Sequence, residues 1–352
     1  MYLPDATRGV VKSVDSVDLA ATEVEGVVVN TYHLSQDPGP KMLAKTKGIK
    51  NLMNYKGLVT SDSGGWQVFS LIHKSAQGGT ITDEGVEFNI GNKTKKIFTP
   101  EDSIKAQFSI LSDIVICLDD FTSPTAAKAR AKESVERTVL WAKRSKLEFE
   151  KQCTKRKLTN NQKPLLLAVI QGGWDKDLRK LCAEKLIEIG FDAYGYGGYA
   201  VNEDTGLDME LSDYIAKLIP DTALKFALGN GKPIDIARLR QMGWDLFDCT
   251  LPTRDSRHQR LYNFTKAPKK YKDLCNPKTY EYLYINKAMY TTDQSPISKN
   301  CDCHTCKNYT RAYLHHLFKI QDTLAYRLAT IHNLRHYTKL IQYIRTFEQK
   351  EK

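Results

Sequence analysis

Short apolar segments recur along the chain and are separated by longer amphipathic or polar stretches. Continuous, β-branched-rich runs of this length are typical of buried parallel strands. We expect eight such strands, at residues 2–4, 26–30, 57–62, 113–120, 165–173, 193–198, 225–231 and 246–252. Helical patterns lie between several of them, as at residues 134–151 and 177–190. This alternation predicts an α/β fold, a (β/α)₈ TIM barrel, with an open doubly wound sheet as the alternative.

Most of the predicted strands end in a polar or glycine-rich cluster. These clusters are Asp62-Ser63-Gly64-Gly65, Asp119-Asp120, Gln171-Gly172-Gly173, Gly197-Gly198, Gly229-Asn230-Gly231 and Asp248. A barrel gathers the C-terminal ends of its strands on one face, where its active site lies. The doubly wound alternative has less support, because no GxGxxG follows the first strand. The pattern therefore predicts a site at the C-terminal mouth of a barrel.

Two regions depart from plain alternation of strand and helix. Residues 77–98 alternate apolar and polar positions between turn glycines, which predicts an inserted β-hairpin. After residue 261 the pattern breaks, and residues 262–309 are rich in Lys, Tyr, Pro and Cys. Residues 310–348 then show helical spacing throughout.

A dense cysteine cluster lies in the second of these regions. Cys301, Cys303 and Cys306 form C-x-C-x₂-C, and three thiolates with one histidine are a usual ligand set for structural zinc. Spacing does not choose the histidine, and the candidates are His304, His315, His316, His332 and His336. Free structural thiols are the alternative. We therefore expect a barrel over residues 1–261 and, over residues 262–352, a zinc-binding subdomain with a C-terminal helix that closes the barrel.

Composition narrows the classes of partner and compartment. The 352 residues carry 52 Lys+Arg against 41 Asp+Glu, a net charge of +11. This excess of positive charge favours a polyanionic partner such as nucleic acid. The alternative is an ordinary basic protein without such a partner. No run approaches the ~20 apolar residues of a membrane span, and the N-terminus does not resemble a signal peptide. The clustered cysteines indicate a reducing compartment. We expect a cytoplasmic protein without a membrane partner.

Asp248 stands out because it lies within the apolar run of the last predicted strand. A buried carboxylate is costly unless it is paired or has a chemical role. One reading is a buried ion pair with Arg254. The other is a chemical role, since an aspartate is ionised at neutral pH if its pKa stays near the reference value of ~3.9.

The motifs SDSGGWQVFS (61–70), NTYHL (30–34), IQGG (170–173), FDCTLPTR (247–254), CDCHTC (301–306) and TIHNL (330–334) resemble those of tRNA-guanine transglycosylases. The resemblance covers the chain from about residue 2 to its end. It implies a (β/α)₈ barrel with a zinc subdomain, and an enzyme that exchanges guanine in nucleic acid for a free 7-deazaguanine base. It also implies that the chain lacks the usual N-terminal sheet of the family.

The resemblance assigns roles to individual residues. It implies that Asp248 is the covalent nucleophile and that Asp62 is the general acid/base, although Asp62 is also suited to capping the segment after it. It implies a base pocket formed by Asp119, Gln171, the backbone of Gly198 and Tyr199, and the side chains of Trp66 and Leu228. For Trp66 and Leu228, ordinary core packing is the alternative.

Further residues match nucleic-acid and metal contacts. The resemblance implies that Arg254 and Arg257 contact bases beside the exchanged guanine, and that Arg260 and the lysine-rich run 266–272 contact phosphates; a solvated surface is the alternative for the lysines. TIHNL implies His332 as the fourth ligand of one Zn²⁺. A homodimer is also expected, with the exposed faces of residues 310–348 as its candidate interface.

Some positions depart from the family pattern. Phe121 and Tyr199 are bulkier than the usual residues beside the base, and His258-Gln259 replaces the usual pair after the second arginine. The leading hypothesis is exchange of guanine at the wobble position of the tRNA anticodon, in the queuosine pathway. The alternatives are the same exchange on DNA guanine and a non-catalytic partner subunit, although such a subunit would be expected to lose Asp248.

Overall fold

The computed structural model describes residues 1–67, 70, 79–90, 94–123, 126–198, 201–202 and 206–351. Its centre is an eight-stranded sheet with the spatial order β1-β13-β12-β9-β8-β7-β3-β2. The strands are β1 (Tyr2–Pro4), β2 (Gly26–Val29), β3 (Leu58–Ser61), β7 (Ile114–Ile116), β8 (Leu165–Ile170), β9 (Ala193–Tyr196), β12 (Leu224–Ala227) and β13 (Leu246–Cys249). All eight predicted strands are confirmed.

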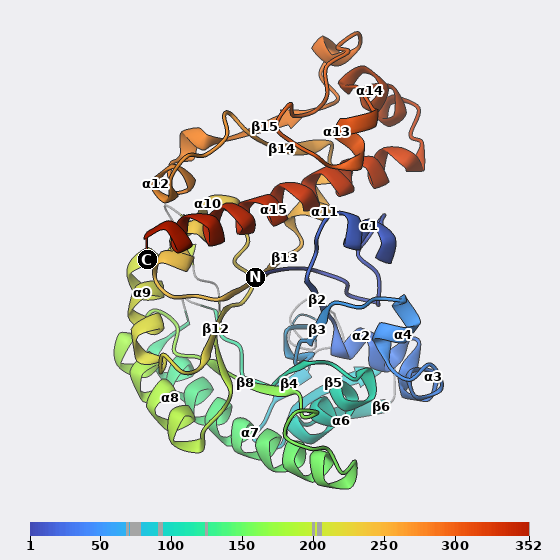
Figure 1. Cartoon of the computed structure of the whole chain (residues 1–352). Coiled ribbons are helices and arrows are strands. Elements are labelled where there is room, and N and C mark those ends of the chain that lie inside the picture. Colours follow the sequence, from blue (N-terminus) through green and yellow to red (C-terminus); the bar gives the residue numbers. More distant parts are fainter. Residues whose placement is uncertain are drawn as a thin grey trace.

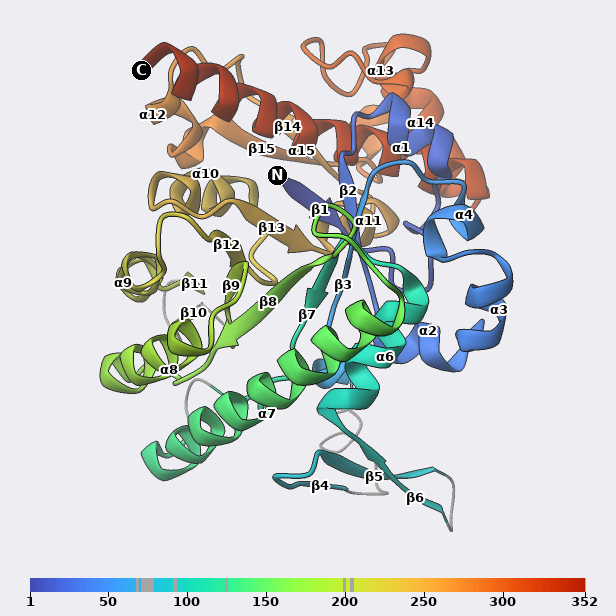
Figure 2. The same ribbon diagram turned by 60° about the horizontal axis from the view of Figure 1, so that its bottom comes forward.

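The sheet closes on itself to form a barrel. Every pairing within it is parallel, and its strands follow one another in chain order around the ring. The first strand meets the second through a parallel bridge between Asp5 and Val28, and the Ala6 amide donates to the Val28 carbonyl at 2.7 Å. Figures 1 and 2 show the strands around a common centre. The (β/α)₈ prediction is confirmed, and the doubly wound alternative is wrong.

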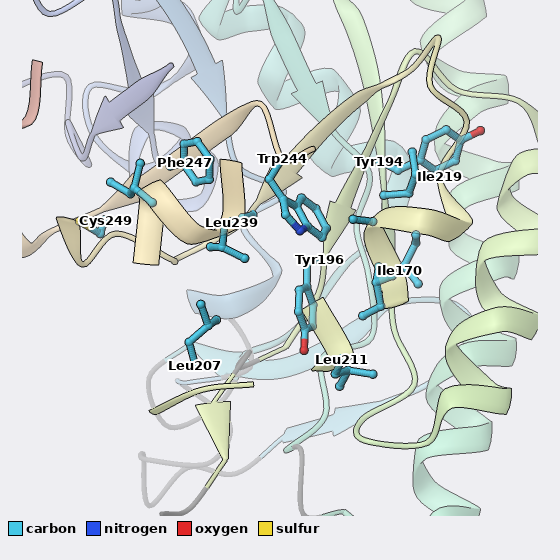
Figure 3. Close-up of a cluster of buried hydrophobic side chains, with 14 of the residues drawn as sticks. Ile170, Tyr194, Tyr196, Leu207, Leu211, Ile219, Leu239, Trp244, Phe247 and Cys249 are labelled. Atoms are coloured by element: carbon cyan, nitrogen blue, oxygen red, sulfur yellow. The ribbon is translucent and has the colours of Figure 1, made fainter. Parts of the chain in front are cut away.

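Alternate residues of each barrel strand fill its interior. The inward apolar side chains form one cluster, whose buried members are Leu3, Ile114, Ile116, Leu167, Val169, Ala193, Phe226 and Leu246. Residues of the opposite parity pack outward against the helices. Figure 3 shows part of that outer layer, where Trp244 stacks on Tyr196 with ring centroids 5.9 Å apart. Because both faces of each strand are covered, barrel strands read as continuous apolar runs.

Helices cover the outside of the barrel (Figure 2). They are α1 (Ser16–Ala21), α2 (Thr31–Gln36), α3 (Gly39–Lys45), α4 (Ile49–Met53), α6 (Pro100–Ile110), α7 (Lys128–Lys155), α8 (Lys176–Ile189), α9 (Met209–Leu218), α10 (Pro233–Gln241) and α11 (Leu251–Arg257). The helices predicted at 134–151 and 177–190 correspond to α7 and α8. A two-stranded sheet of β10 (Val201–Asn202) and β11 (Gly206–Leu207) follows β9.

The insertion after β3 is a three-stranded antiparallel sheet of β4 (Gly79–Ile81), β5 (Val86–Ile90) and β6 (Thr94–Phe98). The predicted antiparallel insertion is therefore present, but it has one strand more than the predicted hairpin. Thr82 closes the additional turn by donating its amide to the carbonyl of Gly85 at 3.0 Å. Trp141 on α7 donates to the carbonyl of Asp83 at 2.8 Å, which ties this sheet to the barrel. Residues 77, 78 and 91–93 of the predicted hairpin lie outside the described residues.

The C-terminal region contains β14 (Arg260–Phe264), α12 (Tyr271–Leu274), η1 (Pro277–Thr279), β15 (Tyr280–Tyr284), η2 (Ala288–Tyr290), α13 (His304–Asn308), α14 (Arg311–Lys319) and α15 (Thr323–Glu351). The helical segment predicted at 310–348 is thus two helices. They separate at Gln321, which has a φ of +58°. Within the described part of the chain, no helix is both long and apolar enough to cross a membrane.

The long helix α15 lies between the barrel and the antiparallel pair β14–β15 (Figure 1). On the barrel side, the Tyr337 hydroxyl donates to the Gly231 carbonyl at 2.7 Å. On the other side, Asn333 accepts from the Tyr262 amide at 3.1 Å and donates to the Arg260 carbonyl at 3.0 Å. The helix therefore fixes the C-terminal region to the rim of the barrel.

Candidate active site at the barrel mouth

Side chains alternate between the inside and the outside of the barrel along each strand, and this alternation continues past the apolar interior. It places polar side chains at the C-terminal mouth. Side chains of one parity lie on one face of a strand, so the residue two positions past an inward apolar residue also faces inward. Six residues that lie two or, for Asp62, four positions past an inward apolar residue form what we call the mouth layer: Asp5, Asn30, Asp62, Gln171, Leu228 and Asp248. The structure thereby brings together Asp62, Gln171, Leu228 and Asp248, which sequence reasoning had singled out separately.

Asp248 ends the inward face of β13 and is half-buried. The Gly229 amide donates to its Oδ1 at 2.7 Å. Burial raises the pKa of Asp248 to about 7, and the charge of Asp5 acts in the same direction. The ion-pair reading of Asp248 is wrong for the described residues, because Arg254 lies 3.9 Å from Asp255 instead and forms no pair with Asp248.

Asp62 follows β3 and receives three hydrogen bonds. Asn30 donates through Nδ2 at 2.5 Å, and the amides of Thr31 and Gly64 donate at 2.9 and 3.0 Å. Burial nonetheless raises the pKa of Asp62 to about 7. The Gly64 contact is cap-like, so Asp62 caps the segment that follows it. A carboxyl group with a pKa near neutrality can both donate and accept a proton at working pH.

Asp119 and Gln171 form a hydrogen-bonded pair, in which Gln171 is buried and Asp119 is half-buried. Gln171 donates through Nε2 to Asp119 at 2.6 Å, and its Oε1 is buried without a partner in the described structure. Burial raises the pKa of Asp119 to about 6. A Cβ at Gly197 would lie 2.6 Å from Gln171 Nε2, so only glycine leaves room for this amide. The pair presents acceptor oxygens, which suits a ligand edge that carries N–H donors.

Trp66 and Leu228 lie at the mouth, and neither is fully buried. Trp66 is 40% exposed and packs edge-on against Phe121, with ring centroids 4.6 Å apart. Leu228 is half-buried at the top of the barrel interior. Gly198 is half-buried with a φ of +88°, whereas Tyr199 lies outside the described residues. Neither Trp66 nor Leu228 is therefore a fully buried core residue.

The three candidate nucleic-acid arginines differ in their surroundings. Arg254 is exposed on α11, and Arg257 on the same helix donates to the Thr253 carbonyl at 2.7 Å. Arg260 pairs with Asp255 through Nε at 2.9 Å and Nη2 at 2.5 Å, and it stacks over Tyr282 at 4.7 Å. Of the three, Arg254 is thus the one whose guanidinium is most open to an external anion.

Cys301, Cys303, Cys306 and His332 come together as one group. Their ligand atoms all lie within 4.8 Å of one another, and His332 Nδ1 is 3.2 Å from Cys306 Sγ. The other ring nitrogen, Nε2, donates to the Tyr262 carbonyl at 2.7 Å, which leaves Nδ1 facing the thiols. These four residues could hold a metal ion. His336 is not part of the group, because its ring stacks on Phe264 at 4.2 Å.

Three mouth residues carry contacts that the sequence reading did not assign. Asn30 belongs to the NTYHL motif, but the motif did not indicate its hydrogen bond to Asp62. Asp5 lies two residues after inward-facing Leu3. Arg179 is buried and donates to the carbonyls of Ile170, Gly173 and Gly197, so it holds two strand ends together. Strand parity could have identified Asn30 and Asp5, whereas no sequence signal pointed to Arg179.

The raised pKa of Asp248 makes stability depend on pH. The folded-state pKa of about 7 exceeds the unfolded reference of ~3.9, so the stabilising effect of protonation is present below ~3.9 and is lost as pH rises through about 7. Asp248→Asn cannot ionise and can still accept from Gly229. Urea unfolding is therefore expected to show that its stability advantage over wild type grows by about 3 kcal/mol between pH 5 and pH 9.

The control is Asp213→Asn, at a half-buried acid on α9 that pairs with Lys217, and its stability difference from wild type should show no such growth. If the difference in unfolding free energy between Asp248→Asn and wild type were the same at the two pH values, this would contradict the raised pKa of Asp248.

The fold and the site define a class of protein: a (β/α)₈ barrel with a carboxylate-lined mouth and, beside it, a Cys₃His group suited to a metal ion. A family model described as queuine tRNA-ribosyltransferase matches residues 1–348. The chain belongs to this family, and it is an enzyme of the pentosyltransferase type.

Individual relatives cover nearly the whole chain. The queuine tRNA-ribosyltransferase of Caldanaerobacter subterraneus subsp. tengcongensis is 37% identical over 346 residues, which are 98% of this chain and 85% of that protein. The protein of the same name from Actinobacillus pleuropneumoniae is 37% identical over 345 residues, which are 98% of this chain and 83% of the relative. That from Haemophilus influenzae is 38% identical with the same coverage.

Proposed function

We propose that this enzyme exchanges guanine at the wobble position of a tRNA anticodon for a free 7-deazaguanine base. The observation that carries the proposal is the mouth layer, in which Asp62 and Asp248 lie at strand ends beside the Asp119–Gln171 pair. The names of the relatives support tRNA as the nucleic acid and ribosyl transfer as the reaction. A tRNA substrate also implies a cytoplasmic enzyme.

In the proposed reaction, the Asp248 carboxylate attacks C1′ of the nucleotide while the bond from C1′ to guanine breaks. The departing base takes up a proton from Asp62, and Asp248 holds the ribose as an ester. The incoming base then returns a proton to Asp62 and displaces Asp248, so the nucleic-acid backbone stays intact. This is the double displacement of retaining glycoside chemistry. The raised pKa of Asp62, about 7, suits a group that gives and regains one proton.

Base recognition is proposed for the acceptors opposite these acids. Guanine and its 7-deaza relatives carry a ring N–H and an exocyclic amine along one edge. Asp119 accepts from such donors, and the partnerless Oε1 of Gln171 offers a further acceptor in the same buried place. Trp66 and Leu228 would cover the two faces of the base, since stacking on an aromatic side chain tolerates any flat base. The backbone of Gly198 and Tyr199 is proposed to complete this pocket.

Zinc is the ion proposed for the Cys₃His group. Three thiolates and an imidazole within reach of one ion are the donor set of structural zinc, and the fixed tautomer of His332 fits it. The ion would hold the segment from residue 262 onward against the barrel. Arg254 and Arg257 on α11 and the lysine-rich run 266–272 within this segment would bind the tRNA. We also propose a homodimer as the assembly.

The proposal is tested by incorporation of labelled guanine into two acceptors, an unmodified tRNA with a guanine wobble base and a duplex DNA. Label is expected in the tRNA, and a tRNA with adenine at that position should stay unlabelled. Label in DNA alone would replace the proposal with exchange on DNA. Label in neither acceptor would replace it with a binding subunit.

A further inference from the structure

Asp5 is a third carboxylate at the mouth of the barrel, placed between the two proposed reactive acids. Its strand β1 pairs with β13, and the register sets Leu3 opposite Asp248. On its other side Asp5 bridges Val28 of β2, the strand that leads to Asn30. Leu3 faces inward, so Asp5 faces inward as well and lies about 7 Å further toward the mouth.

The carboxylate of Asp5 is only partly satisfied by the protein. The Thr7 hydroxyl donates to Oδ1 at 2.7 Å. Across the described ranges, Oδ2 accepts no hydrogen bond and no ion pair involves Asp5, which is half-buried. Arg257 and His33 are near enough for their pKa values to respond to its charge. The same charge raises the pKa values of Asp62 and Asp248. A donor from a bound ligand would therefore be strongly favoured at Oδ2.

We propose that Asp5 is a substrate-positioning residue that accepts a hydrogen bond from the 2′-hydroxyl of the exchanged nucleotide and so selects RNA over DNA. The inference rests on the proposed function, in which Asp248 attacks C1′. The 2′-hydroxyl is bonded to the carbon next to C1′, and Asp5 lies on the strand next to that of Asp248. This hydroxyl is the group by which a protein distinguishes RNA from DNA.

The hydroxyl contact also bears on the rate of the reaction. Hydrogen bonds to the hydroxyl beside the reacting carbon strengthen in the oxocarbenium-like transition state of retaining glycoside chemistry. A deoxyribose offers only a CH₂ group there, which leaves Oδ2 desolvated and unpaired. The enzyme should therefore react more slowly with a 2′-deoxynucleotide even when every other nucleotide is unchanged.

The test uses a stem-loop RNA with guanine at the wobble position and the same RNA with a single 2′-deoxyguanosine there. For wild type, kcat/KM for labelled-guanine incorporation is expected to be roughly 10- to 100-fold higher with the ribonucleotide. Asp5→Val should bring this ratio close to one. Glu184→Gln, which removes an exposed acid on α8, should keep the wild-type ratio.

Several results would overturn the inference while leaving the proposed function standing. One is equal wild-type activity on the two RNAs. Another is an Asp5→Val variant that loses activity equally on the two RNAs, because removal of a merely structural residue would have that effect. If the valine variant does not fold, the ratio is measured for Asp5→Asn, where it should fall below the wild-type ratio because a neutral amide oxygen is a weaker acceptor than a carboxylate. No label in either RNA with wild-type enzyme would instead refute the proposed function, and the inference with it.

Discussion

Replacing Asp248 by asparagine is expected to reduce labelled-guanine incorporation into tRNA at least roughly a thousandfold, because a neutral amide is a poor nucleophile toward C1′. The fold should survive, since an asparagine Oδ1 can accept the Gly229 amide in the same way. Wild type, mixed with tRNA without a free base and then denatured, should yield a covalent protein–tRNA species on a denaturing gel, and Asp248→Asn should yield none.

The matched control for this variant is Asp245→Asn, the same change just before the opposite end of β13. Asp245 accepts from the Lys225 amide and pairs with Arg240, away from the mouth. Its loss should alter stability without altering the covalent species. If Asp248→Asn kept activity within about tenfold of wild type, the nucleophile would have to be sought elsewhere in the mouth layer.

The barrel was predictable from sequence because its strands are buried on both faces and therefore appear as uninterrupted apolar runs. The two errors in the number of elements have separate causes. The insertion β4–β6 lies outside the barrel, so its short strand β4 shows too few apolar positions to be recognised. The break between α14 and α15 leaves the apolar periodicity almost intact, and only the left-handed residue Gln321 and the cap by Asp322 mark it.

The site was predictable in its residues but not in its electrostatics. The sequence reading took Asp248 at its reference pKa, whereas burial and the charge of Asp5 raise the pKa of Asp248 to about 7. Both causes are tertiary, because Asp5 is 243 positions away along the chain and reaches Asp248 only through the β1–β13 pairing. The orientation of the Gln171 amide likewise depends on Asp119, a residue of a neighbouring strand end.

Removing one ligand of the Cys₃His group is expected to have the largest effect on stability. Cys306→Ser should lower the zinc content to well below one equivalent and the thermal midpoint by roughly 10 °C or more, because binding energy of a structural metal is folding energy. The group joins α13 to α15, and Cys303 lies in the same core cluster as Val27 and Val59 of the barrel strands. Its loss should therefore also loosen α15 from the barrel rim.

Two controls separate metal binding from loss of a side chain. Cys275→Ser removes a half-buried thiol of the same region outside the group, and it should keep full zinc. His332→Ala and His336→Phe then test which histidine is the fourth ligand. The His336 ring is buried and stacked, with its pKa lowered to about 3 by burial, so phenylalanine should replace it at little cost in metal. A His332→Ala protein with one full equivalent of tightly bound zinc would reject His332 as a ligand.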